Sequence, residues 1–209
     1  MQFNPDCQAC PRLARFLAAG RVTHPGYYCR PVAPFGDAQP RLLIVGLAPG
    51  FHGANRTGRP FTGDHAGILL YETLHAFGYA TRPVSVAAND GLQLIGCRIT
   101  NAVKCVPPEN RPETDEIKRC NDYLKQDLAA LPAGATILAL GQIAHAAVLR
   151  ALGLRAKDFV FGHAVRHALP GGTSLYDSYH CSRYNTQTRR LTREMFRAVF
   201  TRIASEQKE

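Results

Sequence analysis

The feature that most constrains the fold is a run of four aliphatic residues, Leu42 to Val45, with no polar residue among them. A strand with one face in water alternates apolar and polar residues, whereas a strand of a parallel sheet is covered by helices on both faces. The run therefore predicts a central, doubly buried strand. The segment that follows it, from Gly46 to Asp64, is rich in glycine and polar residues. Ligands of open α/β sheets bind beyond the carboxyl ends of the strands, so we expect a functional site in this loop.

Further strands alternate with helical patterns along the chain, and Asp64 and Thr114 are candidate N-caps. The pattern predicts strands at 97–101, 136–140 and 174–179, and helices at about 65–78, 115–131, 142–152 and 191–203. This alternation predicts an α/β fold, a three-layer α/β/α domain with a mainly parallel sheet. We expect residues 1–209 to form a single domain.

The charge of the chain points to a polyanionic partner. Lys and Arg number 25 against 16 Asp and Glu, which gives a net charge of +9. Nucleic acid is favoured over a membrane, because the sequence has no apolar run of spanning length and no basic amphipathic segment. The first thirteen residues lack the basic and apolar regions of a secretory signal, so we expect a cytoplasmic protein. We also expect a monomer, which would be associated with the nucleoid when bound to nucleic acid.

Four of the seven cysteines form a candidate metal-binding set. Cys7 and Cys10 form a C-x-x-C pair, Cys105 follows the second strand, and Cys120 lies on the apolar face of the 115–131 helix. A structural zinc site usually has two close pairs of ligands, whereas iron-sulfur clusters accept wider spacings. The spacing alone leaves zinc, an iron-sulfur cluster and four unrelated buried cysteines open. Three cysteines are not expected to be metal ligands: Cys29, Cys97 and Cys181. Of these, Cys29 would be the first candidate to replace one of the four ligands.

Three separated motifs carry a resemblance to a known family. They are GLAPGFHGANRTGRPFTGD at 46–64, TNAVKCVPPENRP at 100–112 and HCSRYNTQTRRLT at 180–192. Together with the four cysteines, they resemble the family 5 uracil-DNA glycosylases, which carry a [4Fe-4S] cluster. The resemblance implies a four-stranded parallel sheet and a monofunctional glycosylase of base excision repair. Such an enzyme flips uracil, and other deaminated bases such as hypoxanthine, out of DNA and uses water to hydrolyse the N-glycosidic bond.

The resemblance also implies roles for individual residues. The cluster ligands are Cys7, Cys10, Cys105 and Cys120, in a structural subsite built from the N-terminal segment and the 101–124 region. The remaining assignments form three groups: catalytic residues Asp64, His180 and Asn101; base-binding residues Phe61, Gly46, Ala48, Pro49 and Gly50; and DNA-binding residues Arg183, Tyr184, Asn185, Arg189 and Arg190.

Hydrolysis of the glycosidic bond leaves a cationic sugar and an anionic base, which explains the catalytic assignments. Related families place an acidic or amide residue at the position of Ala48, which has no polar group. Asp64 is therefore expected to position water or stabilise the sugar cation, although a carboxylate there is also a plain N-cap. His180 is expected to donate a hydrogen bond to the base carbonyl, and Asn101 to read a base edge.

Two departures from the family pattern fall in the third motif. Cys181 stands where proline commonly follows the histidine, and Arg189 stands where glycine is usual. One alternative from another functional class remains, a non-catalytic iron-sulfur protein that binds DNA or carries electrons. A phosphate loop at 53–60 is excluded, because no Lys followed by Ser or Thr is present.

Overall fold

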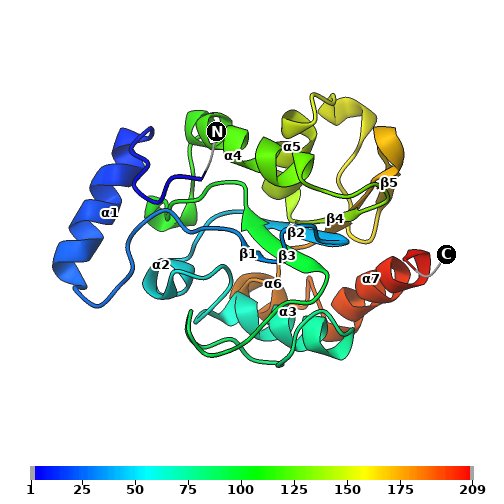
Figure 1. Ribbon diagram of the computed structural model, residues 1–209, viewed down its shortest axis with the longest axis horizontal. Helices are drawn as coiled ribbons and strands as arrows, with labels where there is room; N and C mark the ends of the chain where they lie inside the picture. The colour runs from blue at the N-terminus through cyan, green and yellow to red at the C-terminus, as the bar shows by residue number, and fades with distance from the viewer. Residues whose placement is uncertain (1–2, 208–209) are drawn as a thin grey trace.

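The computed structural model describes residues 3–207 and has a parallel sheet at its centre (Figure 1). All five residues of β2 (Leu42–Gly46) are buried, as the unbroken apolar run predicts. Its neighbours β3 (Cys97–Asn101) and β4 (Thr136–Leu140) both run parallel to it, and β6 (Ser174–Ser178) runs parallel to β4. The predicted strands therefore occupy the expected places, and the α/β fold is confirmed.

Two short edge strands extend this parallel core. The strand order is β1-β3-β2-β4-β6-β5, in which β1 (Phe35–Gly36) and β5 (Arg166–Ala168) are antiparallel to their neighbours. The prediction of a four-stranded parallel sheet is thus correct for the centre, but the complete sheet is mixed and six-stranded. The edge strands were not predicted, because two or three residues are too few to show an alternation of apolar and polar side chains.

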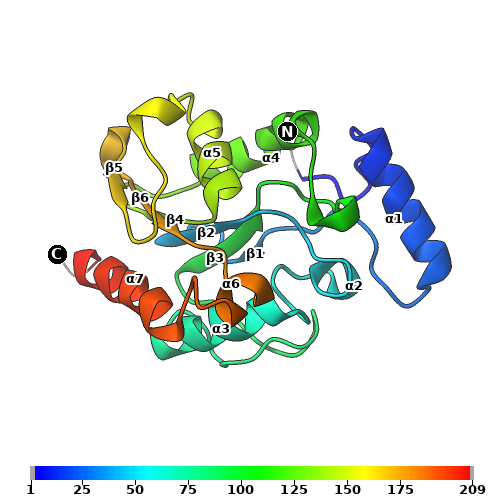
Figure 2. The same cartoon turned by 180° about the vertical axis from the view of Figure 1, so that it is seen from behind.

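Helices cover both faces of the sheet, as Figures 1 and 2 show. On one face, α3 (His65–Ala76) and α7 (Arg193–Glu206) pack Leu70, Leu74, Phe196 and Phe200 into one apolar cluster. On the other, α4 (Thr114–Ala129) and α5 (Gln142–Ala151) contribute Leu124 and Val148 to a second cluster. The remaining helical segments are α1 (Pro11–Thr23), α2 (Ala54–Thr57), α6 (Arg183–Gln187), η1 (Pro108–Asn110), η2 (Ala156–Asp158) and η3 (Pro170–Gly172).

The two candidate N-caps have different outcomes. Asp64 caps α3, because its side chain accepts a hydrogen bond from the Gly67 amide. The prediction that Thr114 caps α4 was wrong, because Glu113 occupies the N-cap position. The Glu113 amide donates a hydrogen bond to Glu116 Oε2 at 2.7 Å. The hydrogen bond from the Glu113 amide to the Glu116 side chain, rather than the Thr114 hydroxyl, caps the N-terminus of this helix.

A third apolar cluster joins α1 to the segment after β3. It contains Leu13, Leu17, Val103 and Tyr123, and all four candidate cysteine ligands lie in it or pack against it. In the described part of the chain, every helix is too short or too polar to span a membrane.

Candidate functional site

The carboxyl ends of β2 and β3 bring the first site residues together. Gly46 pairs in register with Asn101, and the buried Asn101 Oδ1 has no hydrogen-bond partner. A Cβ on Gly46 would lie 2.4 Å from this oxygen and 2.7 Å from two ring carbons of Phe61. Glycine is therefore required here for the Asn101 amide and the Phe61 ring to approach the strand. An orphaned amide oxygen beside an aromatic ring is suited to reading the polar edge of a planar ligand.

His180 reaches the same place from β6. Its ring stacks on Phe61 with the centroids 5.7 Å apart and the planes inclined by 30°. Phe61 itself has a left-handed backbone, with φ of 54°, which is uncommon for a bulky residue and typical of constrained sites. The structure thus gathers Gly46, Phe61, Asn101 and His180 at one end of the sheet, as the sequence predicts.

The His180 imidazole is held neutral at physiological pH. Burial lowers its pKa to about 4, because the protein interior disfavours the charged ring. Asn185 Nδ2 donates to the His180 carbonyl at 2.8 Å, which fixes the backbone at the end of the strand. The residue lines a hollow of about 540 Å³ together with Leu47, Tyr179 and Arg190. A neutral imidazole in this position can donate a hydrogen bond to a developing anion without a preceding proton transfer.

The two carboxylate oxygens of Asp64 have different surroundings. Oδ1 accepts the Gly67 amide at 3.1 Å, so the N-cap reading is confirmed. Oδ2 faces the loop of Gly50 and Gly53, where an added Cβ would lie 3.3 Å and 2.3 Å from it, respectively. Burial raises the pKa of Asp64, and the amides of Gly67 and Ala66 oppose that shift. Oδ1 therefore caps the helix through Gly67, whereas Oδ2 points towards the glycine loop.

The loop between Gly46 and Gly50 offers backbone rather than polar side chains. Its carbonyls are partly engaged, because Ala102 N donates to Gly46 O at 2.9 Å and Val103 N donates to Leu47 O at 3.0 Å. The Ala48 methyl group packs against the third apolar cluster. Pro49 is buried and Gly50 is half-buried. Gly46 thus lies against the Asn101 and Phe61 side chains, Leu47 lines the His180 hollow, and Gly50 lies beside Asp64.

The third motif forms a short helix, α6, that the sequence analysis did not predict. Ser182 caps it by accepting from Asn185 N at 3.4 Å, a signal that the sequence did contain. Tyr184 is 70% exposed, and Arg190 lies over the Tyr179 ring at 4.6 Å. Arg189 has φ of 58°, which explains why glycine is the ordinary residue at this position in the family. The loop keeps its turn despite the arginine.

The four candidate ligand cysteines share the third apolar cluster, which joins α1, α4 and the segment after β3. Burial raises the pKa of Cys105, and so do the neighbouring Cys120, Cys7 and Cys10 thiols. Burial likewise raises the pKa of Cys120 to about 11, although the Lys104 amide donates to its sulfur at 3.2 Å.

The four cysteines supply a donor set of thiols only. Thiolates bind both structural zinc and iron-sulfur clusters, so the chemistry of the set fits either group.

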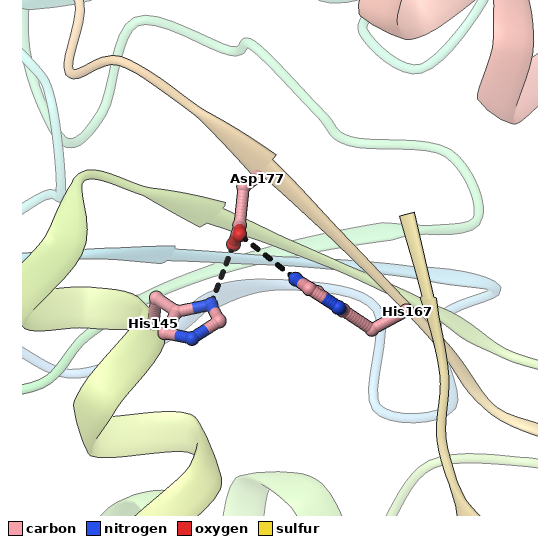
Figure 3. Close-up of side chains that lie close together, drawn as sticks. All are labelled: His145, His167 and Asp177. Atoms are coloured by element: carbon pink, nitrogen blue, oxygen red, sulfur yellow. Dashed lines mark hydrogen bonds and ion pairs between the residues drawn. The ribbon is translucent and has the colours of Figure 1, made fainter. Parts of the chain in front are cut away.

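A buried His–Asp–His group lies beside the site, and the sequence analysis missed it (Figure 3). His145 Nδ1 lies 2.8 Å from Asp177 Oδ1, and His167 Nε2 lies 3.2 Å from Asp177 Oδ2. His145 Nε2 faces the Phe159 carbonyl at 2.9 Å, so both ring nitrogens point at acceptors. Burial acts to lower the pKa of His145, but the Asp177 carboxylate raises it above its ordinary value. The group is satisfied as a buried ion pair, and it ties α5 to β6 three residues before His180.

Comparison with known proteins identifies the class. The family model described as the uracil DNA glycosylase superfamily matches residues 33–204. The chain is therefore a member of this superfamily, and it is a hydrolase acting on N-glycosidic bonds.

Individual relatives narrow the assignment. The chain is 47% identical to the type-5 uracil-DNA glycosylase of Thermus thermophilus, over 92% of this chain and 90% of the relative. It is 40% identical to that of Pyrobaculum aerophilum, over 96% and 89%, and 43% identical to that of Mycobacterium leprae, over 93% and 88%. Within the superfamily, the chain belongs to the type-5 family.

Proposed function

We propose that this protein excises uracil from DNA by base flipping and water-mediated hydrolysis, in base excision repair. The observation that carries the proposal is the convergence of Phe61, Asn101 and a neutral His180 at the carboxyl ends of three strands. The relatives that share nearly the full length of the chain are named for activity on uracil in DNA. Family membership favours this enzyme over the alternative of a non-catalytic iron-sulfur protein.

Each pocket residue has a role that follows from its chemistry. The Phe61 ring offers a flat face to the flipped base, and base–aromatic stacking is worth about 1–3 kcal/mol. The Asn101 amide, whose Oδ1 has no partner in the protein, reads the base edge. His180 donates to the base carbonyl as negative charge develops there, which typically contributes about 3 kcal/mol to lowering the barrier.

Asp64 acts on the sugar side of the reaction. Its Oδ2 atom, which the helix cap leaves free, positions the attacking water or stabilises the cationic sugar. The nearest lysine in the sequence to Asn101, Lys104, is buried, with its ammonium 2.9 Å from Asp127 Oδ2 and also bonded to Thr100. A lysine held in this way supports a monofunctional reaction with water rather than an amine nucleophile and a lyase step.

The same site accommodates other deaminated bases, such as hypoxanthine. Ala48 removes a polar side chain from the first motif and so takes away one discriminator between bases. The exposed helix α6, which begins at Arg183, and the following Arg189 and Arg190 contact DNA beside the flipped nucleotide.

Cys7, Cys10, Cys105 and Cys120 hold a [4Fe-4S] cluster with a structural role. When bound, the cluster cross-links the N-terminal segment, the chain after β3 and α4. This is supported by the resemblance of the four cysteines to the ligand set of the family and by the apolar cluster that they share.

The cluster is tested by iron and sulfide analysis of protein purified without oxygen. Cys120→Ser should lose iron and the visible absorption, whereas Cys29→Ser, also buried in this region, should retain both. Colourless, iron-free wild-type protein would remove the cluster from the proposal.

The activity is tested with duplexes containing one uracil or one hypoxanthine, heated in alkali after incubation to cut abasic sites. Wild-type protein should produce cleavage, and His180→Ala should reduce the single-turnover rate about 10²- to 10³-fold. Gel filtration in the same buffer should give the mass of a monomer. Absence of cleavage on every lesion duplex would refute the glycosylase assignment.

A further inference from the structure

Phe61 occupies a position in a tight turn that is usually filled by glycine. The Thr62 amide donates to the Arg59 carbonyl at 3.3 Å, which closes a turn with Pro60 in second place and Phe61 in third. Proline favours the second position of such turns, whereas a positive φ in third place, 54° here, is ordinarily supplied by glycine. A bulky residue keeps this strained conformation only where the surrounding structure holds it.

The strained backbone determines where the ring and the carbonyl group of Phe61 lie. The ring is buried against Gly46 and stacks on His180. The carbonyl lies against the first turn of α3, where a Cβ on Gly67 would be 1.8 Å from the Phe61 oxygen. Two glycines therefore make room for this one conformation of the turn.

Two hydroxyl groups converge on the peptide group that precedes Phe61. Tyr71, on α3, donates from its hydroxyl to the Pro60 carbonyl at 2.8 Å, and Thr62 Oγ1 donates to the same oxygen at 3.2 Å. The carbonyl is part of the planar peptide group that includes the Phe61 nitrogen, and φ of Phe61 is the rotation between this plane and the side chain. Bonds that hold the plane therefore fix the direction of the ring.

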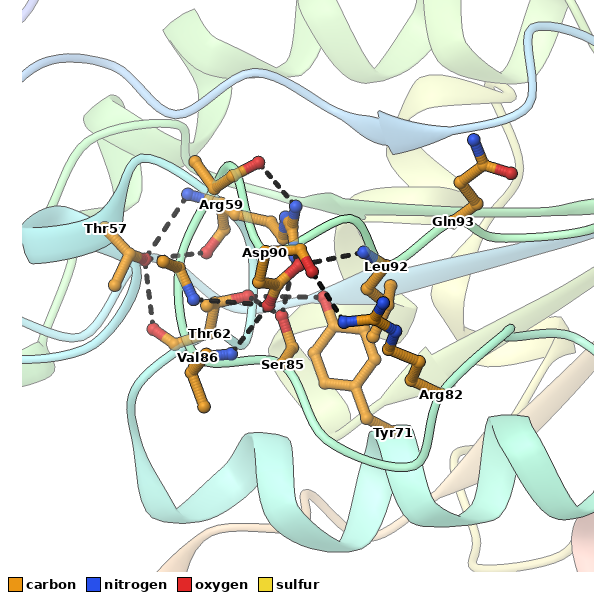
Figure 4. A network of polar contacts seen from close by, with 12 residues as sticks. Thr57, Arg59, Thr62, Tyr71, Arg82, Ser85, Val86, Asp90, Leu92 and Gln93 are labelled. Atoms are coloured by element: carbon orange, nitrogen blue, oxygen red, sulfur yellow. Dashed lines mark hydrogen bonds and ion pairs between the residues drawn. The ribbon is translucent and has the colours of Figure 1, made fainter.

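A chain of hydrogen bonds supports the Thr62 hydroxyl from behind (Figure 4). Because this hydroxyl has one proton, given to Pro60, it accepts from Ser85 Oγ, which lies 2.7 Å away. Ser85 Oγ accepts from Arg59 Nη1 at 3.0 Å, and the same nitrogen donates to Asp90 Oδ1 at 2.7 Å. Burial acts to raise the pKa of Asp90, but Arg59 and the loop amides lower it well below its ordinary value. The turn is thus anchored to a buried ion pair.

The Tyr71 hydroxyl makes the shorter of the two bonds to the Pro60 carbonyl. The side chain is 0% exposed, so it has no direct access to a ligand. Burial raises the pKa of Tyr71 to about 12, and the phenol therefore remains a donor across the physiological range.

We infer that Tyr71 is a positioning residue for base recognition, because its hydroxyl holds the turn that presents the Phe61 ring to the flipped base. Without it, the turn keeps the longer Thr62 bond and also populates relaxed backbones in which the ring lies elsewhere. Affinity for a flipped base then falls with the fraction of molecules that retain the productive turn. The inference rests on the proposed function and adds to it a residue outside the pocket.

The test measures the affinity of Tyr71→Phe for two duplexes by fluorescence anisotropy. One contains a 2′-fluorinated deoxyuridine, which resists cleavage, and the other a tetrahydrofuran abasic site, which offers no base to Phe61. The variant should bind the first duplex about fivefold more weakly than wild type, the scale of one neutral hydrogen bond, and the second within about twofold. The single-turnover rate on uracil at saturating enzyme should also stay within about twofold, because Asp64 and His180 are unchanged.

Tyr79→Phe is the matched control. Tyr79 belongs to the same apolar cluster as Tyr71, is 2% exposed, and donates its hydroxyl to Gln207 Oε1, also at 2.8 Å. Each substitution removes one hydroxyl and one hydrogen bond and leaves the ring in place, so a general loss of stability would affect both proteins. Tyr79→Phe should bind both duplexes like wild type, and urea unfolding verifies that all the variants are folded.

A double-mutant cycle shows whether Tyr71 acts through Phe61. In a Phe61→Leu background, where no aromatic ring remains to be positioned, Tyr71→Phe should change the affinity for the fluorinated duplex by less than about twofold.

Three results would each overturn the inference: wild-type affinity of Tyr71→Phe for the fluorinated duplex, an equal loss on the abasic duplex, or a fivefold loss that persists with Phe61→Leu. In these cases uracil excision by the wild-type protein would still support the proposed function. A loss confined to the fluorinated duplex, in a protein that leaves uracil in place, would instead support the positioning role and refute the proposed excision.

Discussion

The two roles of Asp64 can be separated by two substitutions at one position. Asp64→Asn retains an oxygen that can accept the Gly67 amide, now at 3.1 Å from Oδ1, but removes the negative charge. Asp64→Ala removes both the cap and the charge. Asn and Asp are equally good N-caps, so Asp64→Asn should change the free energy of unfolding by less than about 1 kcal/mol, the scale of the helix-dipole contribution. Asp64→Ala should lose about 1–2 kcal/mol.

Catalysis should follow the charge and not the cap. We expect both variants to lower the single-turnover rate of uracil excision about 10²-fold, the usual contribution of a positioned acid or base. The rate is measured with enzyme in excess over a uracil duplex, and stability is measured by urea unfolding in the same buffer. An Asp64→Asn enzyme within about twofold of wild type would refute the catalytic role and leave Asp64 as a helix cap.

Three further predictions test the pocket and its surroundings. Gly46→Ala would place a methyl group 2.4 Å from Asn101 Oδ1 and 2.7 Å from the Phe61 ring, so unfolding studies should show a loss of about 1–3 kcal/mol together with a large drop in kcat/KM. Since burial lowers the pKa of His180 to about 4, the pH profile of excision should show no acid limb from this residue near its ordinary value of 6.5. The pKa of His145 is raised in the folded state, so its ion pair should stabilise the protein fully below about pH 6.5 and progressively less as the pH rises through the raised value. The difference in unfolding free energy between wild type and His145→Gln should therefore shrink with rising pH, and a constant difference would contradict this account.

Local patterns in the sequence were sufficient to predict the parallel core. The bounds of β3 and β4 match the predicted 97–101 and 136–140. For β4 the reason is that a doubly buried strand needs continuous apolar residues, and the run from Ile137 to Leu140 is visible without any tertiary information. The same holds for the strand ends, where Gly46, Asn101 and His180 meet as their positions predict.

The sequence by itself thus determined the layered α/β fold, the place of the site and the family motifs, all of which depend on residues near one another in the chain. Only the tertiary structure decided which oxygen of Asp64 caps the helix, that His145 is paired with Asp177, and that Arg59 is paired with Asp90. The physical reason is the distance along the chain. The partners of the two buried ion pairs, His145–Asp177 and Arg59–Asp90, are 32 and 31 residues apart in the sequence. Local periodicity predicts helices and strands, but it does not predict which charged side chains come into contact when distant elements pack together.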